Sequence, residues 1–159
     1  MEIDSLEKGM DLILWRHADA EDGVPDAGRK LTAKGEKQSQ QMGQWLKARL
    51  PEKFTLLVSP AKRAQQTALG LSKSFATVKS IGPGADAVAV LVAAGWPDAK
   101  GTVIVVGHQP TLARTAALLL AGAEADWSMK KGSIWWISNR VRQGEAQTVL
   151  RVMMSTEFV

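Results

Sequence analysis

The chain contains two histidines, and each follows a continuous apolar run of the kind found in buried strands. His17 comes after the run 12–15 and adjoins Arg16, and His108 comes shortly after the run 102–106. A lone histidine at a strand end is more often a structural hydrogen-bonding residue than a catalyst. Two histidines at equivalent positions, one of them beside an arginine, favour a shared site.

Phosphoryl transfer is the chemistry that suits the Arg16–His17 pair. A guanidinium carries a permanent charge and can donate two parallel hydrogen bonds to phosphate oxygens. An imidazole with an ordinary pKa of about 6.5 is largely unprotonated at neutral pH and can attack phosphorus directly. A hydrogen bond from its other nitrogen to a backbone carbonyl would fix the reactive tautomer.

A third element is the segment SPAKRAQQT at residues 59–67, where a strand ends and a helix begins. Arg63 falls on the first turn of that helix, so its charge is expected to face the same crevice as the histidines. Taken alone, the segment favours an ordinary solvated arginine on a lysine-rich helix. Taken together with Arg16 and the two histidines, it favours a phosphate-binding arginine.

Alternating strands and helices must position these residues. We expect strands near residues 10–15, 54–58, 78–81 and 102–106, helices over 32–50, after residue 60, over 86–94 and from 110 to 122, and a final strand pair at 133–138 and 147–154. The pattern predicts a three-layer α/β/α sandwich with a mostly parallel central sheet and an antiparallel edge. In such sheets, sites gather at the carboxyl ends of the strands.

Length and composition predict one domain, over residues 10–159. Residues 1–9 precede a second methionine and have no apolar period, so we expect a poorly ordered N-terminal extension there. The absence of cysteine excludes disulfides, zinc-thiolate sites, iron–sulfur clusters and thiol nucleophiles. The first ten residues are polar and acidic, and no later run approaches the roughly 20 apolar residues of a membrane span. We therefore expect a cytoplasmic protein without a membrane partner.

The net charge of +4 and the pI near 9.5 are compatible with an anionic partner. The basic residues are spread along the chain without interleaved aromatics, however, so we expect no nucleic-acid partner. Most of the six tryptophans fall where a core would use them. Trp96 and Trp127 lie in apparent loops, where they either anchor the loop or border a docking face.

Three segments resemble the signature segments of the histidine phosphatase superfamily in order and spacing: LILWRHADAE, LVSPAKRAQQTA and VIVVGHQPTLA. Within that superfamily, the chain resembles the SixA-type phosphohistidine phosphatases in its segment GRKLTAKG and in the short length of its region 76–101. The resemblance covers residues 10–154, and it implies a fold like that of phosphoglycerate mutase.

Carried over by position, the resemblance implies that His17 is the nucleophile and becomes transiently phosphorylated. It also implies that Arg16, Arg63 and His108 surround the transferring oxygens. Arg29 stands where the family has an arginine before a Leu-Thr pair, which implies a part in binding phosphate or substrate. The sequence contains no GKS or GKT phosphate loop and no cluster of acidic metal ligands, so we expect neither a cofactor nor a metal.

Larger relatives use a carboxylate as general acid, and no residue of this sequence can be assigned to that role. Asp86 and Asp19 are the candidates, although such residues commonly cap helices or are solvated. An imidazole leaving group needs less help than an alkoxide, so a site without a strong acid favours cleavage of a P–N bond.

The resulting hypothesis is a phosphohistidine phosphatase that acts on a phosphorylated protein, such as a phosphotransfer domain or a phosphocarrier. One alternative is a phosphomonoesterase for a small phosphorylated metabolite, which would require a closed pocket that short loops do not favour. Another is a non-catalytic module that binds phosphate, which would need the cationic groups but not both histidines.

Overall fold

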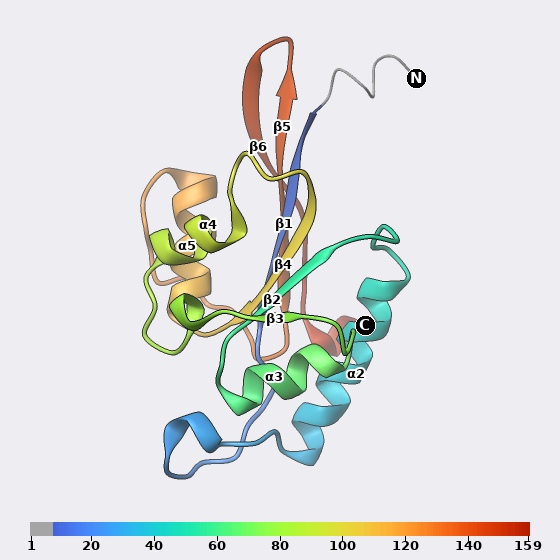
Figure 1. The fold of residues 1–159 in the computed structure, drawn as a ribbon, viewed down its shortest axis with the longest axis vertical. Coiled ribbons are helices and arrows are strands. Elements are labelled where there is room, and N and C mark those ends of the chain that lie inside the picture. The colour runs from blue at the N-terminus through green and yellow to red at the C-terminus, as the bar shows by residue number, and fades with distance from the viewer. Residues whose placement is uncertain (1–7) are drawn as a thin grey trace.

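A computed structural model describes residues 8–159, which form a six-stranded sheet flanked by helices (Figure 1). The strands are β1 (Lys8–Arg16), β2 (Thr55–Val58), β3 (Ala76–Thr77), β4 (Gly101–Gly107), β5 (Ile134–Arg142) and β6 (Glu145–Met154). The α-helices are α2 (Ala33–Lys47), α3 (Lys62–Leu69), α4 (Ala87–Ala94) and α5 (Thr111–Ala121). Short 3-10 helices are η1 (Asp26–Gly28), η2 (Lys79–Ile81) and η3 (Thr156–Phe158).

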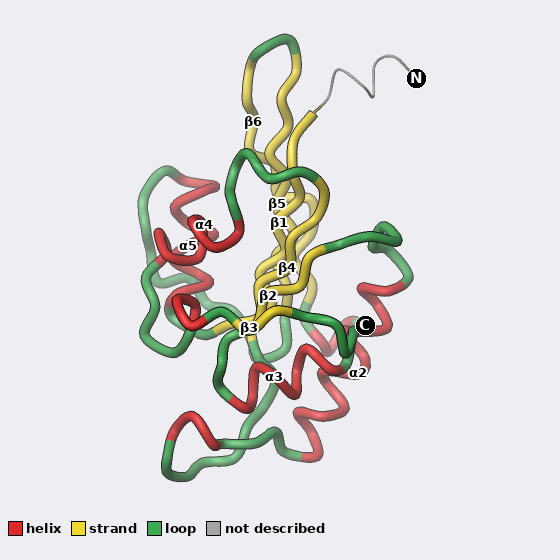
Figure 2. The backbone as a smooth tube through the Cα atoms, viewed as in Figure 1, coloured by secondary structure: helices red, strands yellow, loops and turns green. Residues whose placement is uncertain are grey.

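The sheet has the strand order β3-β2-β4-β1-β5-β6. Neighbouring strands from β3 to β1 run parallel, whereas β5 pairs antiparallel with β1, and β6 pairs antiparallel with β5. Figure 2 shows the strands as one layer, with α4 and α5 to one side and α2 and α3 to the other. The predicted α/β/α sandwich, mostly parallel with an antiparallel edge, is confirmed.

Each face of the central strand β1 contributes to a separate core. Leu12 and Leu14 pack in a cluster with residues of α4 and α5, and Ile13 and Trp15 pack in a cluster with residues of α2 and α3. All four side chains are fully buried. A strand covered on both faces has no polar side to show, which is why this segment is a continuous apolar run.

Two predicted strand boundaries change in the structure. Strand β1 begins at Lys8, so residues 8 and 9 of the predicted extension belong to the sheet, and its residues 1–7 lie outside the described part of the chain. The strand predicted at 78–81 is wrong. The last residue that pairs with β2 is Thr77, at the end of β3, and residues 79–81 form the 3-10 helix η2. Ile81, the last residue of η2, packs in the core on the α4 side. It is apolar because it is buried, and an apolar residue in a short segment does not by itself indicate a strand.

The C-terminal strand pair is longer than predicted. Its polar stretch 139–146 completes both strands, which are joined at Gln143 and Gly144 with φ of 53° and 81°. Two consecutive residues with positive φ make the tight turn that suits the twist of a hairpin. The outer half of this hairpin is largely exposed, so no apolar pattern marks it in the sequence.

The loop tryptophans act as anchors. Trp127 stacks on Trp135 with ring centroids 5.7 Å apart, and both rings pack against the core on the α4 and α5 side. Trp96 is partly buried against the same core.

None of the helices in residues 8–159 has both the length and the apolar character needed to cross a bilayer.

Helices α2 and α3 approach each other at two glycines. A Cβ on Gly43 would lie 2.0 Å from the carbonyl oxygen of Gly70, and a Cβ on Gly70 would lie 2.3 Å from that of Ser39. Such distances are impossible without moving backbone. Only glycine therefore lets α3, which carries Arg63, pack this closely on α2.

We predict that Gly43→Ala destabilises the protein by about 1–3 kcal/mol, the usual cost of overpacking, although alanine is the better helix former. Chemical denaturation measures the free energy of unfolding. The exposed neighbour provides a control, because Gln44→Ala is expected to change stability by less than about 0.5 kcal/mol. Equal stabilities of the two variants would contradict the close-approach argument.

Candidate active site

The ends of three parallel strands bring the two histidines together. Strand β1 pairs with β4 up to Arg16 and Gly107, and the backbone N–H of His17 donates to the Gly107 carbonyl at 3.0 Å. On the other side of β4, the N–H of Ser59 donates to the Val106 carbonyl at 3.1 Å. The residues that follow β1, β2 and β4 therefore meet at one edge of the sheet, as the sequence predicted.

The geometry around His17 fixes its tautomer. Its Nδ1 lies 2.8 Å from the Ala18 carbonyl oxygen, which can only accept, so Nδ1 carries the proton. The lone pair of the neutral ring is then on Nε2, which accepts a hydrogen bond from Nε of Arg63 at 3.4 Å. The ring is 8% exposed. This arrangement offers an oriented nucleophilic nitrogen beside a cation.

The loop after His17 is held on two sides. The Ala18 N–H donates to the Thr67 hydroxyl at 3.0 Å, and that hydroxyl donates to the Arg63 carbonyl at 2.7 Å. On the other side, a Cβ on Gly35 would lie 1.9 Å from the Asp19 carbonyl oxygen, so only glycine lets the start of α2 come this close. Both contacts limit the freedom of the His17 ring and of the Arg63 backbone.

The second imidazole, His108, is held by a serine. Its Nε2 lies 2.7 Å from Oγ of Ser59, which also accepts the Ala61 N–H at 3.2 Å. The His17 and His108 ring centroids are 5.2 Å apart. Nδ1 of His108 is buried without a hydrogen-bond partner in the described residues. Such orphaned groups are few in native proteins, and catalytic sites are one place that retains them.

Arg63 is almost fully buried, at 4% exposed, and its guanidinium is engaged by a residue that sequence reasoning missed. Nη1 donates to the Asp26 carbonyl at 2.9 Å, and Nη2 donates to the Asp26 carboxylate at 3.1 Å. Asp26 lies in η1, within the loop between β1 and α2 at the foot of Figure 1. This loop carries several acidic residues, and no pattern in the sequence distinguishes Asp26 from the others.

The other two predicted arginines take different places. Nη1 of Arg16 donates to the Met129 carbonyl at 2.7 Å, and its Nε is buried without a partner in the described residues. Arg29 donates to the Glu21 carbonyl at 2.7 Å and to the second carboxylate oxygen of Asp26 at 3.1 Å. The structure therefore connects Arg29 to Arg63 through a shared carboxylate rather than directly to a histidine.

Both imidazoles are held neutral. Burial is the largest cause that lowers the pKa of His17, to about 4; the Ala18 hydrogen bond opposes this shift, and the nearby charges of Arg63, Arg16 and Arg29 add to it. Burial likewise lowers the pKa of His108 to about 3, together with the charges of His17 and Arg63. Desolvation also lowers the pKa of the Arg16 guanidinium from its ordinary value.

The two candidate acids have structural partners. The Asp19 carboxylate accepts from the Thr32 hydroxyl at 2.7 Å and from Lys131 at 2.9 Å, and the Lys131 hydrogen bond is the largest cause that lowers its pKa. Asp86 is the N-cap of α4 and accepts the Ala89 N–H at 2.8 Å.

Within residues 8–159, no group of three or more histidine, cysteine or acidic side chains is placed to hold a metal ion.

Comparison with known proteins assigns the family. A model of the histidine phosphatase superfamily (branch 1) matches residues 12–82. The phosphohistidine phosphatase SixA of Escherichia coli (strain K12) is 32% identical over 122 residues, which cover 71% of this chain and 76% of that protein. The chain belongs to the histidine phosphatase superfamily.

Solved structures agree with this assignment. The structure of the protein histidine phosphatase SixA complexed with tungstate has a TM-score of 0.76 at 25% identity, over 94% of this chain and 99% of that chain. A phosphoserine phosphatase mutant from Entamoeba histolytica shares the fold, with a TM-score of 0.69 at 18% identity over 94% and 99% of the two chains. The phosphoglycerate mutase-like fold expected for a histidine phosphatase is thus observed.

We predict that neither imidazole of this histidine phosphatase titrates between pH 7.5 and about 5.5, since both folded pKa values lie well below the unfolded value of about 6.5. The unfolded chain therefore binds more protons, and this contribution to stability is present above pH 6.5 and is lost as the pH falls toward about 4. NMR of the two ring spin systems measures the titrations directly. A midpoint near 6.5 for either ring would contradict the burial argument.

Proposed function

We propose that the protein hydrolyses phosphohistidine in a phosphorylated protein through a covalent intermediate on His17. The observation that carries this proposal is the orientation of that ring, with Nδ1 committed to the Ala18 carbonyl and Nε2 directed at Arg63. A phosphate-binding module would need the arginines alone. An oriented, neutral imidazole beside them supports nucleophilic catalysis.

The proposed reaction consists of two in-line displacements. In the first, the hydrogen bond from Arg63 to Nε2 opens, the freed lone pair attacks phosphorus, the P–N bond to the substrate imidazole breaks, and the leaving imidazole takes up a proton from solvent. In the second, water attacks the phosphoryl group on His17, the new P–N bond breaks, and phosphate and a proton are released. The net change is hydrolysis of phosphohistidine to histidine and inorganic phosphate.

Positive charge stabilises the proposed transition state. Arg63 is already hydrogen-bonded to the attacking nitrogen, and the charges of both Arg63 and Arg16 reach the two imidazoles. Fixed donors beside the equatorial oxygens of a loose transition state lower the barrier without reorganising during the reaction. We assign phosphate binding to Arg16, Arg63 and His108, with Arg29 acting through the carboxylate that it shares with Arg63.

The site chemistry supports a P–N bond over a phosphate ester. Hydrogen bonds from Arg29 and Arg63 lower the pKa of Asp26, the carboxylate nearest the catalytic arginine, so this group is ionised at neutral pH and is a poor proton donor. A leaving imidazole tolerates such a site better than an alkoxide does. The E. coli relative at 32% identity is itself a phosphohistidine phosphatase, which supports the same substrate class.

We predict that a quenched reaction with a phosphorus-32-labelled phosphohistidine protein leaves acid-labile, base-stable label on the parent chain and none on His17→Ala. Turnover of that variant should fall about a thousandfold or more, because the nucleophile is removed. His108→Asn is the matched variant. It retains the nucleophile, so label should still form, but about a hundredfold more slowly.

Two results would contradict the mechanism. Label that persists on His17→Ala would move the nucleophile elsewhere, and the absence of both label and phosphate release from the parent would favour a phosphate-binding module. Release from small phosphomonoesters but not from phosphohistidine would favour the metabolite phosphatase instead.

We predict that Asp26→Asn tightens binding of inorganic phosphate by about two- to fivefold, since a partly exposed carboxylate no longer competes for the Arg63 guanidinium. The inhibition constant for inorganic phosphate measures this. Asp22→Asn is the control, because Asp22 lies in the same loop and pairs with Arg29 at 3.9 Å, and no ion pair within residues 8–159 joins it to Arg63. Weaker binding by Asp26→Asn would instead mean that Asp26 positions Arg63.

A further inference from the structure

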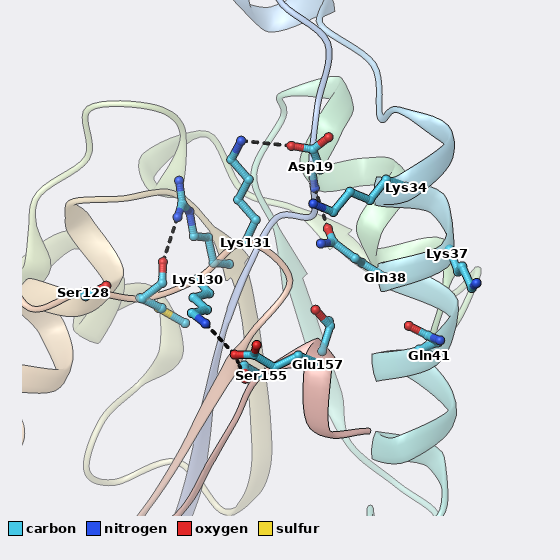
Figure 3. A pocket seen from close by; sticks show the side chains of 13 residues that line it. Asp19, Lys34, Lys37, Gln38, Gln41, Ser128, Lys130, Lys131, Ser155 and Glu157 are labelled. Carbon is cyan, nitrogen blue, oxygen red and sulfur yellow. Dashed lines mark hydrogen bonds and ion pairs between the residues drawn. The ribbon is translucent and has the colours of Figure 1, made fainter.

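A pocket lies next to the site formed by His17, Arg63 and His108. This open pocket of about 690 Å³ is bounded by α2, the loop 128–131 and η3, and Figure 3 shows its side chains. Arg16 and Asp19, which flank the proposed nucleophile in the sequence, belong to its lining, but neither histidine does. The pocket therefore adjoins the phosphoryl site through Arg16 and is separate from it.

The lining is mainly cationic. Besides Arg16 it contains Lys34, Lys37, Lys130 and Lys131, against two carboxylates. Each carboxylate is already matched, since Glu157 pairs with Lys130 and Asp19 pairs with Lys131. Lys34 and Lys37 are exposed and form no ion pair within residues 8–159, although the charge of Lys34 acts on Asp19. The pocket thus carries an excess of positive charge that the protein itself does not neutralise.

The two unpaired lysines belong to a polar stripe on α2. Residues 34, 37, 38 and 41 of the lining follow helical spacing, so they share one face of the helix. With a rise of 1.5 Å per residue, this stripe extends the pocket by about 10 Å away from the start of α2. Figure 3 shows Lys34, Gln38 and Gln41 in succession along this helix. The stripe begins next to the loop that follows His17, because Gln38 accepts the Asp19 N–H at 2.9 Å.

We propose that this pocket docks acidic side chains that flank the phosphorylated histidine of the protein substrate. The inference rests on the proposed function and adds a determinant of substrate choice. Sites for small anions converge buried donors on one point, whereas Lys34 and Lys37 are exposed and spaced along a helix. Such an array suits several carboxylates on a protein surface. Exposed charges of this kind mainly raise the rate of association with an oppositely charged partner and the specificity of binding.

The test uses two synthetic phosphohistidine peptides of equal length, one with aspartate and glutamate around the phosphohistidine and one with asparagine and glutamine. Phosphoramidate serves as a substrate too small to reach the pocket. We expect the parent to cleave the acidic peptide with a kcat/KM about tenfold above that of the neutral peptide. The double variant K34E/K37E should lose this preference through KM and should keep the parent rate on phosphoramidate.

The control is K53E/K73E, which makes the same change of charge at two exposed lysines outside the pocket lining. It should retain the preference for the acidic peptide. Parent activity on both peptides without preference would overturn the docking site and leave the proposed function standing. A K34E/K37E variant that also loses activity on phosphoramidate would overturn it too, by showing that the lysines act on the catalytic crevice. A parent that is inactive on all three substrates would overturn the proposed function and the docking site together.

Discussion

The site depends on the in-register parallel pairing of β1 with β4. This ladder ends with the His17 N–H bonded to the Gly107 carbonyl, which places the residue after one strand beside His108, the residue after the other. A shift of one residue would turn the side chains of β1 to the opposite faces of the sheet. The two faces of β1 are buried in separate cores, so such a shift would disrupt the packing of both cores. The register is therefore strongly determined.

Electrostatic balance is the second constraint on the site. Two buried imidazoles and an almost fully buried arginine lie together, and like charges in a desolvated region repel strongly. The protein avoids that repulsion by keeping both imidazoles neutral and by giving Arg63 a carboxylate partner from a loop. Asp26 therefore balances the buried charge of Arg63 whatever reaction the site performs, and in the proposed function it would compete with an incoming phosphoryl group for the Arg63 guanidinium.

In the proposed function, the histidine site and the basic pocket have different tasks. The buried donors would hold a small reacting group, and the exposed lysines on α2 would bind a larger surface. Arg16 joins the two, since it lines the pocket while its charge reaches the imidazoles.

The sequence by itself determined the alternation of strands and helices, the mostly parallel sheet and the edge at which His17 and His108 meet. These follow from apolar runs and helical spacing, which are local signals. Only the tertiary structure decided which carboxylate meets Arg63, that the polar stretch 139–146 extends both strands of the predicted C-terminal pair, and that α2 and the loop 128–131 form a basic pocket. Those features depend on contacts between distant segments and on exposed residues, whose types are not restricted by burial and therefore leave no pattern along the chain.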